Sequence, residues 1–450
     1  MLLNPLTVEL ATFLRREVNL QLRLRAAKHV LDWLGCAIYG LRFLHAKSLL
    51  AYLKDVPEGK ATAIGAGRKY FEQAAFHNGC LGSIADFEDF HRCSSLQPGA
   101  VVIPAALSVA EHVGASGAQL LDAIVRGYEV MIRVGQFLGP KHGEFFHHSS
   151  SAGAFGAAMA AASLLELSEE QCAWALGNAG SRTGGLLQMR AEPCMTKALH
   201  TGMAVQSGVL AALLAKRNFT GPKYLLEGPK GLFKAIAPDG SPIEIIYDMD
   251  AEWRIADVSF RPWPVARHSQ AAIDAALKAK ARLGANQEIA KVRVETHAQG
   301  MQAGNRPTPN FELEAKASLQ HAVATALVKT RPALEDFAPP FEHAKVNAMR
   351  ARIALSENPE LSAAYPQQHG AAVELHLLDG SIVREQLADS WGDPAWPLSV
   401  AEIESKQLQL LLKVGVPPSQ VSELAQATKQ LPEAKNLHEF SKRLERVQAA

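Results

Sequence analysis

The chain has 450 residues, which is more than one domain commonly holds, so two domains are expected. Hydrophobic residues make up 48% of the sequence and charged residues 20%, the composition of a globular protein with enough apolar material for a core. The 46 basic and 45 acidic residues nearly cancel. This balance argues against a nucleic-acid or acidic-membrane partner, because both favour a basic excess.

The cysteines and the N-terminus bear on the cellular compartment. The cysteines form neither a CxxC pair nor a zinc pattern, and they are Cys36, Cys80, Cys93, Cys172 and Cys194. The N-terminal residues lack the charged-then-apolar order of a signal peptide. No uninterrupted apolar run reaches the roughly 18 residues of a transmembrane helix, and the nearest, 151–167, is mostly Ala, Gly and Ser. We therefore expect a cytoplasmic protein with reduced thiols and no membrane partner.

The first half of the chain has the pattern of successive helices. From Ala27 onward, apolar residues recur at the spacing of one helix face, and Gly40 fits a helix stop. The segment 168–171 is a capping box, in which a serine is followed three residues later by a glutamine. The same periodicity predicts further helices at 104–112, 117–138, 151–167, 168–182 and 202–216.

The pattern changes near Pro262. Residues 291–296 and 373–377 alternate with period two, as half-buried strands do, and Asp379-Gly380 is a hairpin turn signal. Helical patterns lie between these strands at 269–283 and 318–327, and helices return after Pro397 at 400–412, 421–430 and 437–447.

These patterns predict a mainly α protein with a smaller α/β (α+β) domain. We expect a large helical domain over 1–268 and the smaller domain over 269–392. The C-terminal helices, 393–450, are expected to pack back on the helical domain, which would make that domain discontinuous.

An acidic run is the first candidate for chemistry. Asp86, Glu88 and Asp89 put three carboxylates within four residues, and His91 follows them. If the run is helical, Asp86 and Asp89 share a face. A metal site is one interpretation, although the spacing matches no recognised ligand pattern. A solvated helix start with capping acids is a second, and a pocket-lining acid, with Asp86 as first candidate, is a third.

A histidine pair is the second candidate. His147 and His148 precede three serines and a helix of small residues. A single histidine is more often structural or solvent-facing than functional. Here, hydroxyl groups and the unpaired N–H groups of a helix N-terminus favour an anion site. No Gly-x-Ser-x-Gly elbow or other nucleophile motif is present, so we set a serine hydrolase aside.

A basic pair is the third candidate. Lys197 and His200 lie three residues apart, and Thr196 is expected to cap their helix. A lysine in the first turn opposes the helix dipole, which is unfavourable for structure alone. An anionic ligand explains Lys197 more easily than a structural role does.

Two arginines flank a Pro-Trp-Pro run where the sequence pattern changes. Arg261 and Arg267 suit bidentate binding of a carboxylate, and His268 follows them. Domain junctions are favoured places for ligand pockets. The alternative is an interdomain linker with surface arginines.

Several segments in this order and spacing resemble the MmgE/PrpD family over nearly the whole chain. The segments that carry the resemblance are DWLGCAIYG (32–40), AAFHNG to ADFED (74–89), PGAVVIPAAL (98–107), GYEVMIRVGQ (127–136), HSSSAGAFGAAMAAASLL (148–165), TKALHTGMAVQSG (196–208), EGPKGLF (227–233), RPWPVARHSQAAIDAAL (261–277) and EAKASLQHAVATAL (314–327). The resemblance implies a homodimer without metal or cofactor. It also implies a helical domain, an α/β lid and an active site between them. Its members are dehydratases, decarboxylases and epimerases of short di- or tricarboxylates.

The resemblance also assigns site residues. The family's acidic pocket residue falls on Asp86, and its histidine falls on His147, with His148 as the alternative because the pair leaves the register open. The lysine of its TK-x-LH segment falls on Lys197, followed by His200.

The chain departs from the family pattern at several positions. Gln97 stands where relatives often have a histidine before proline, and Gln270 stands where they have a histidine after the Pro-aromatic-Pro run. Arg261 replaces a lysine, His321 a tyrosine and Phe90 a threonine. A glutamine amide does not titrate, so two imidazoles expected near the pocket are absent. The relatives' dehydratase and decarboxylase assignments therefore do not transfer as they stand.

The sequence thus favours a lyase-type enzyme acting on a small di- or tricarboxylate. His147 would move a proton, Lys197 with Arg261 or Arg267 would hold carboxylates, and Asp86 would orient or share protons. The other expected substrate-binding residues are His148, His200, His268, Gln97, Gln270 and His321. Two alternatives stay open: an epimerase or isomerase of an amino- or imino-dicarboxylate, and a non-catalytic polycarboxylate-binding protein.

Overall fold

The computed structural model describes residues 4–192 and 194–447. The chain divides into two compact units, one of Met1–Val258 with Ser399–Ala450, the other of Ser259–Leu398. The sequence placed these boundaries at 268 and 392. The Pro-Trp-Pro run with its two arginines therefore belongs wholly to the smaller unit.

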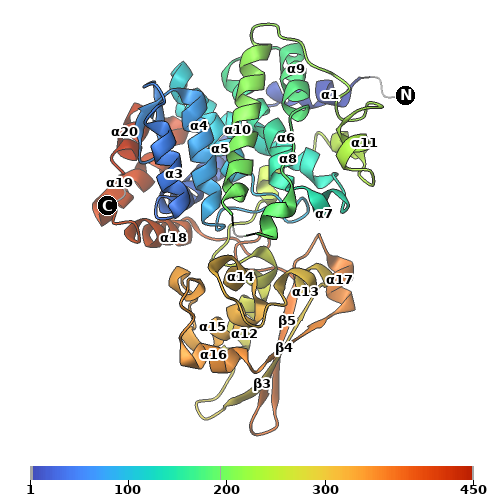
Figure 1. Ribbon diagram of the computed structural model, residues 1–450, viewed down its shortest axis with the longest axis vertical. Helices are drawn as coiled ribbons and strands as arrows, with labels where there is room; N and C mark the ends of the chain where they lie inside the picture. Colours follow the sequence, from blue (N-terminus) through green and yellow to red (C-terminus); the bar gives the residue numbers. More distant parts are fainter. Residues whose placement is uncertain (1–3, 193, 448–450) are drawn as a thin grey trace. The chain divides into compact units, whose positions relative to one another are not determined.

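The larger unit is helical (Figure 1). Its helices are α1 (Leu6–Ala11), α2 (Leu20–Gly40), α3 (Leu44–Leu53), α4 (Phe71–Ile84), α5 (Gly99–Val113), α6 (Gly117–Gln136), α7 (His142–Phe145), α8 (His148–Leu164), α9 (Glu169–Gly180), α10 (Thr196–Ala215), α11 (Leu232–Ile236), α18 (Val400–Leu412), α19 (Pro418–Lys429) and α20 (His438–Glu445). Its 3-10 turns are η1 (Thr12–Leu14), η2 (Leu187–Arg190), η3 (Pro242–Ile246), η4 (Arg254–Asp257) and η6 (Leu431–Glu433), and a small hairpin joins β1 (Ala61–Ala63) to β2 (Gly67–Lys69).

Small residues let the central helices approach closely. Helix α8 packs against α5, α6, α9 and α10. A Cβ atom on Gly127 of α6 would lie 2.9 Å from the carbonyl oxygen of Gly156 on α8, and a Cβ on Gly156 would lie equally close to the carbonyl of Gly127. A Cβ on Gly208 of α10 would lie 2.6 Å from the carbonyl oxygen of Ala154. Side chains at these positions would force the helices apart.

Helix α10 is long and apolar enough to cross a membrane by length and composition alone. Within the unit, 67% of that apolar window is buried, and the helix packs against α4, α8 and α9. The apolar residues of α10 are therefore explained by its packing as a core helix.

The sequence located most of these helices and misplaced some of their ends. The capping box at α9 is confirmed, because Ser168 Oγ accepts from the Gln171 amide at 3.2 Å and Gln171 Oε1 accepts from the Ser168 amide at 3.1 Å. The expected cap of α10 is wrong, because the N-cap position is Met195 and Thr196 is already helical. Helix α5 begins before its predicted start, and Pro104 lies inside it.

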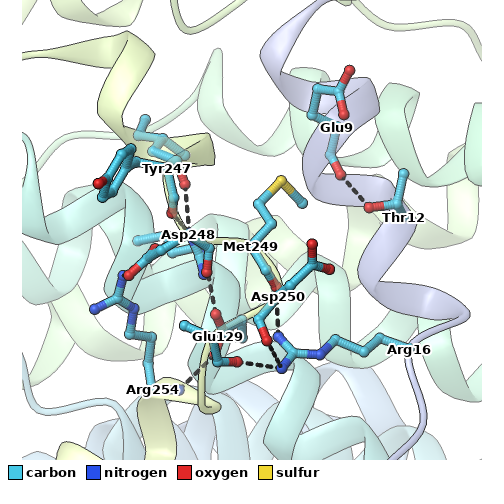
Figure 2. A network of polar contacts seen from close by, with 12 residues as sticks. Glu9, Thr12, Arg16, Glu129, Tyr247, Asp248, Met249, Asp250 and Arg254 are labelled. Atoms are coloured by element: carbon cyan, nitrogen blue, oxygen red, sulfur yellow. Dashed lines mark hydrogen bonds and ion pairs between the residues drawn. The ribbon is translucent and has the colours of Figure 1, made fainter.

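A polar network fixes the segment that ends the first part of the helical unit (Figure 2). Glu129 of α6 accepts from the Arg254 amide at 2.6 Å, and the Arg254 guanidinium binds Asp248 at 2.7 and 2.8 Å. Arg16 donates to the Met249 carbonyl at 2.7 Å. These contacts hold residues 247–257 against α6 and the segment after α1, although the segment has little regular structure.

The smaller unit is an α/β unit built on one sheet (Figure 1). Its strands are β3 (Ile289–Thr296), β4 (Ile353–Glu357), β5 (Ala371–Leu377) and β6 (Ile382–Leu387), and its helices are α12 (Arg267–Ala281), α13 (Ala298–Gly304), α14 (Glu312–Ala317), α15 (Leu319–Lys329), α16 (Ala344–Arg350) and α17 (Pro359–Ala364), with the 3-10 turn η5 (Leu334–Phe337). The strand order is β4-β3-β5-β6, with β3 and β4 parallel and the other pairs antiparallel.

The strand pairing tests one sequence prediction in this unit and shows one strand that the sequence did not predict. The β5–β6 hairpin turns at Asp379-Gly380 as predicted, with Gly380 at φ 84°. Strand β4 was not predicted, because its five residues, IALSE, carry only a short alternating pattern. The fold class, mainly α with a smaller α/β part, is confirmed.

The C-terminal helices pack on the helical unit through a buried ion pair. Helix α18 lies against α2, and Lys406 Nζ contacts Asp32 Oδ1 at 2.7 Å and the Phe87 carbonyl oxygen at 2.6 Å. The Lys406 side chain is 7% exposed and the Asp32 side chain 1%. Both charges are therefore removed from water and depend on each other.

We predict that Lys406→Met destabilises the protein by about 3–5 kcal/mol, because it removes the ammonium group that pairs with the buried Asp32 carboxylate. Lys429 is the matched control, since it pairs with Glu404 at 2.7 Å on the same C-terminal segment with a side chain that is 44% exposed. Lys429→Met should cost less than about 1 kcal/mol. Urea unfolding of both variants checks this, and equal losses would contradict it.

Candidate functional site

The acidic run lies in a loop and not on a helix. Helix α4 ends at Ile84, α5 begins at Gly99, and Asp86 has a left-handed backbone with φ 50°. The condition under which Asp86 and Asp89 would share a helix face is therefore not met. A non-glycine residue in this backbone region is uncommon and is held there by its surroundings.

Asp89 anchors this loop and faces away from solvent. The residue is 2% exposed, and its carboxylate binds His29 Nδ1 at 2.7 Å, the Tyr128 hydroxyl at 2.7 Å and the Gly99 amide at 2.9 Å. Burial alone would raise the pKa of Asp89, but the hydrogen bonds from His29, Tyr128 and Gly99 hold that pKa below its usual value. Asp89 therefore joins α2, α5 and α6 to the loop.

Asp86 forms an ion pair with Lys197 of α10. The Lys197 ammonium lies 2.9 Å from Asp86 Oδ1, with side chains 25% and 18% exposed. Gln97 Nε2 donates to the same Asp86 oxygen at 3.4 Å, and Gln97 Oε1 accepts from Ser149 Oγ at 2.8 Å. The glutamine that departs from the family pattern thus links the acid to the first turn of α8.

His147 lies beside His200 within this group. His147 occupies the N-cap position of α8, and its ring centroid is 5.7 Å from that of His200 on α10. Nδ1 of each ring is buried and has no hydrogen-bond partner among residues 4–192 and 194–447. Burial lowers the pKa of His147 well below its usual value, and the nearby charges of Lys197 and Arg190 lower that pKa further. His147 is therefore a neutral imidazole at pH 7.

His148 faces a different neighbour. Its ring packs edge-on against His142 at 5.0 Å, and burial followed by the charge of His142 lowers the pKa of His148 to about 4. The structure thus gives the two histidines distinct places: His147 beside His200, and His148 beside α7.

Arg190 is a residue near this group that sequence reasoning missed. It ends η2, and an antiparallel bridge between Phe146 and Leu186 holds that segment beside the histidine pair. The His147 amide also donates to the Gly185 carbonyl at 2.8 Å. Arg190 forms no ion pair within the described part of the chain. Only its basic type in a loop before the TK segment could have signalled it.

The two arginines expected to bind carboxylates are buried in the smaller unit. Arg267 donates to Ser390 Oγ and to Asp393 Oδ2, both at 2.7 Å, and is 6% exposed. Arg261 is 1% exposed. The Arg267 fork already binds a carboxylate of its own unit, which accounts for it as part of the fold.

Three other expected substrate-binding residues also have partners within the smaller unit. Gln270 is fully buried and bridges the backbone of residues 263–265. His268 Nε2 binds the Ala317 carbonyl at 2.7 Å. His321 Nε2 donates to the Asp336 carbonyl at 2.7 Å, and its Nδ1 accepts from Arg350 at 3.2 Å. Both ring nitrogens of His321 are thereby occupied.

The site residues therefore fall into two groups. Asp86, Gln97, His147, His148, Lys197 and His200 belong to the helical unit, and Arg261, Arg267, His268, Gln270 and His321 belong to the smaller one. In residues 4–192 and 194–447, no cluster of three or more His, Cys, Asp or Glu side chains could hold a metal ion. The expectation of a metal-free and cofactor-free enzyme stays a prediction.

Comparison with protein families assigns the two parts of the chain. Residues 10–244 match the MmgE/PrpD N-terminal domain, and residues 263–431 match the MmgE/PrpD C-terminal domain. The chain belongs to the MmgE/PrpD family.

Curated relatives within this MmgE/PrpD family are similar at modest identity. The cis-aconitate decarboxylase of Homo sapiens is 28% identical over 74% of this chain and 71% of its own length, and that of Mus musculus is 26% identical over 85% and 81%. A cis-aconitate decarboxylase-like protein of Aspergillus oryzae, oryM, is 28% identical over 52% of each chain, so the match spans about half of that relative. The family and these relatives point to an enzyme of the lyase class.

The charges around His147 give a direct test of the site's electrostatics. We predict that Lys197→Met raises the pKa of His147 toward its usual value, because one neighbouring positive charge is removed. The rise should be partial, since burial is the larger cause. Histidine ring signals followed by NMR through a pH titration measure it, and loss of one signal in His147→Gln assigns the residue.

Lys223→Met is the control for this titration, because Lys223 pairs with Glu170 on an exposed surface. It should leave the pKa of His147 unchanged. A His147 pKa that stays the same in Lys197→Met would show that the lysine charge does not reach the ring.

Proposed function

We propose that this MmgE/PrpD protein is a lyase that acts on a small di- or tricarboxylate by proton transfer beside a carboxylate group. The observation that carries the proposal is the neutral, buried His147, whose Nδ1 has no partner in the described residues, beside the Lys197–Asp86 ion pair. A buried imidazole of this kind next to a cation suits a proton-transfer centre for an anionic substrate. The names of the curated relatives support a decarboxylase-like reaction.

His147 is the proposed proton carrier. In the free protein it is neutral, so it takes a proton from a carbon next to a carboxylate. A bound polyanion places negative charge beside the ring and raises its pKa, so the same residue then returns a proton. Both directions of transfer follow from one imidazole whose charge depends on the ligand.

Lys197 and Arg190 are the proposed anion holders. When a carbanion forms beside a carboxylate, its charge spreads onto the carboxylate oxygens as an enediolate. A positioned ammonium or guanidinium stabilises that charge where it develops. Asp86 holds the ammonium in place until a substrate carboxylate competes for it.

The finer proposal is decarboxylation of a cis-aconitate-like tricarboxylate. Cleavage of the bond to one carboxylate releases carbon dioxide and leaves the electron pair on the substrate, where the remaining carboxylate delocalises it. Protonated His147 then donates a proton to the carbanion, so that a hydrogen replaces the lost carboxylate. Binding of the substrate anion supplies the protonated form of His147.

The epimerase and the non-catalytic binding protein are the alternatives. An epimerase needs two groups that transfer protons on opposite faces of the substrate, and the His147–His200 pair offers two imidazoles. A binding protein needs none. The glutamine at position 97 supplies an amide in place of an imidazole, and an amide does not titrate.

We predict that the protein releases carbon dioxide from cis-aconitate or a related acid and incorporates solvent deuterium into the product. His147→Gln should slow the incorporation by about a hundredfold or more, because general acid–base groups contribute roughly that factor. His148→Gln should slow it far less, because that ring packs against His142. NMR in deuterium oxide follows the exchange, and a carbon dioxide assay follows the cleavage.

Each outcome of this assay assigns one reaction. Exchange with inversion but without carbon dioxide identifies an epimerase, and calorimetric binding without exchange identifies a binding protein. Activity that survives exhaustive chelation fits a metal-free reaction. Activity lost on chelation and restored by one metal would overturn the expectation of no metal.

A pH profile gives a second check on His147. Because the pKa of His147 lies well below its usual value of about 6.5, the residue stays a base in mildly acidic solution. For proton abstraction, in which His147 acts as the base, the acid limb of kcat/KM should therefore lie below pH 6.5. The same shift destabilises the fold as pH falls, because below about pH 6.5 the unfolded chain binds a proton that native His147 does not.

A further inference from the structure

The proposed reaction consumes a proton that the buried His147 has to receive from solvent. When the bond to a carboxylate breaks and carbon dioxide leaves, the electron pair on the substrate takes a proton from His147. In the free protein His147 is a neutral imidazole that is 6% exposed. Each turnover therefore needs a group that carries a proton from water to this ring.

His200 lies beside His147 and also borders on water. Its ring centroid is 5.7 Å from that of His147, and its side chain lines a cavity of about 570 Å³ within the helical unit. The described lining includes His200 but not His147. Leu186 and Leu199 also line the cavity and are 59% and 45% exposed, so water reaches it. The half-buried His200 thus connects this water with the buried ring.

The backbone at Gly185 keeps the two rings in position. Its carbonyl oxygen accepts from the His147 amide at 2.8 Å. A Cβ atom at this position would lie 3.3 Å from Cγ of His200, so the glycine lets that ring lie close against the chain. Ser150 Oγ donates to the His200 carbonyl oxygen at 3.4 Å. Contacts from α8 and from the segment before α10 therefore fix the rings next to each other.

Both rings have a nitrogen available for proton transfer. Nδ1 of His147 and Nδ1 of His200 are buried, and neither has a hydrogen-bond partner in residues 4–192 and 194–447. A proton can pass between the rings through one water molecule or after a small rotation of a ring. An imidazole has two nitrogens, so it can take a proton at one and release it from the other.

The electrostatics give this transfer a direction. Burial lowers the pKa of His200, whereas burial together with the charges of Lys197 and Arg190 lowers the pKa of His147 well below its usual value. In the free protein a proton from water is therefore held more readily by His200. The charge of His200 also lowers the pKa of His147, so the pair carries one proton at a time. A bound polyanion raises the pKa of His147 and draws the proton onto that ring.

The charged groups around His200 have opposite signs. Lys197 lies three residues earlier on α10 and pairs with Asp86 at 2.9 Å. Arg182 and Glu192 line the same cavity as His200. These charges oppose one another, in agreement with burial as the cause of the lowered pKa of His200.

We propose that His200 is the proton relay of this site, which takes a proton from water in the cavity and passes it to His147. One proton moves for each carbon dioxide released, and water replaces the proton that His200 gives up. The inference rests on the proposed function for the need of this proton. It replaces the substrate-binding role expected for His200, because the relay acts through His147 and does not hold the ligand.

The first test follows the proton on His147 and does not depend on turnover. NMR measures how fast the His147 ring N–H exchanges with water at low buffer concentration, in the free protein and with tricarballylate, a tricarboxylate that lacks the double bond of cis-aconitate. His200→Gln should slow this exchange by about a hundredfold, the lower end of what acid–base groups contribute. The affinity for tricarballylate should stay within about twofold.

His45→Gln is the matched control. His45 on α3 is also half-buried, burial lowers its pKa, and its Nδ1 is likewise buried without a partner in the described residues. Its ring neighbour is Phe43, which carries no proton to transfer. His45→Gln should leave the exchange at His147 unchanged. Equal slowing by the two variants, or no slowing by His200→Gln, overturns the relay.

Added imidazole distinguishes a lost relay from a damaged fold. Imidazole carries protons itself, so it should restore the exchange at His147 in His200→Gln. His200→Asn, which has a shorter amide, should behave in the same way. Slowed exchange that imidazole restores in neither variant assigns His200 a structural role and overturns the relay.

Carbon dioxide release separates this inference from the proposed function. A kcat that falls in His200→Gln and recovers with imidazole supports both. Slowed exchange in His200→Gln, with no carbon dioxide released by the unmodified protein, keeps the relay and overturns the lyase. Equal kcat values with and without His200 keep the lyase and overturn the relay. Weaker binding of tricarballylate with unchanged exchange makes His200 a substrate-binding residue and likewise overturns the relay.

Discussion

The buried carboxylate of Asp89 is the constraint on which the rest of the site depends. Residues 85–98 lack helical hydrogen bonds and are largely buried, so their polar groups need partners from elsewhere in the unit. Asp89 receives three hydrogen bonds, and the one from Gly99 places its negative charge at the start of α5, which the helix dipole favours. Lys406 binds the Phe87 carbonyl on the other side of the loop. Asp86 is thus held between anchors from both ends of the chain.

In this arrangement an acid, an ammonium group and two imidazoles lie together, yet they do not satisfy all of one another's hydrogen bonds. Asp86 and Lys197 satisfy each other, while Nδ1 of His147 and of His200 has no partner in the described residues. An unsatisfied buried nitrogen costs free energy, and its retention is typical of a site that a ligand completes. The anchored loop fixes the position of Asp86, while the two histidines are held separately, by the start of α8 and by α10.

The sequence predicted helices, strands and turns where local signals were strong. It missed elements, or their ends, where contacts with distant parts of the chain determine the structure. The capping box at Ser168 and the hairpin at Asp379-Gly380 are set by local hydrogen bonds and turn geometry, so both were predicted. Pro104 suggested a helix start, yet it lies inside α5, whose first residues are buried among neighbouring helices. Strand β4 forms beside β3, and its own five residues give little sign of it.

The prediction of site residues was likewise limited by contacts between residues far apart in the sequence. Residue type and spacing selected Lys197 and His200, and helix geometry does place both on the first turns of α10. The carboxylate of Asp393, 126 positions from Arg267 in the sequence, captures that arginine, and no local pattern reveals such a partner. Gln270 likewise hydrogen-bonds to the backbone of Trp263 and Val265, which a sequence motif cannot distinguish from a ligand contact.

Gln97 and Gln270, the two glutamines at positions where relatives have histidine, therefore differ in structural role. Gln270 is buried and hydrogen-bonds to the backbone of its own unit. The glutamine that stands there in place of a histidine therefore contributes to the hydrogen bonding of the fold. Gln97 touches Asp86 directly and offers a neutral amide at a place where a histidine could carry charge. An amide there cannot compete with Lys197 for the Asp86 carboxylate as a charged imidazole would. In the proposed mechanism, the Asp86–Lys197 pair is accordingly the main electrostatic contact that an incoming substrate carboxylate has to rearrange.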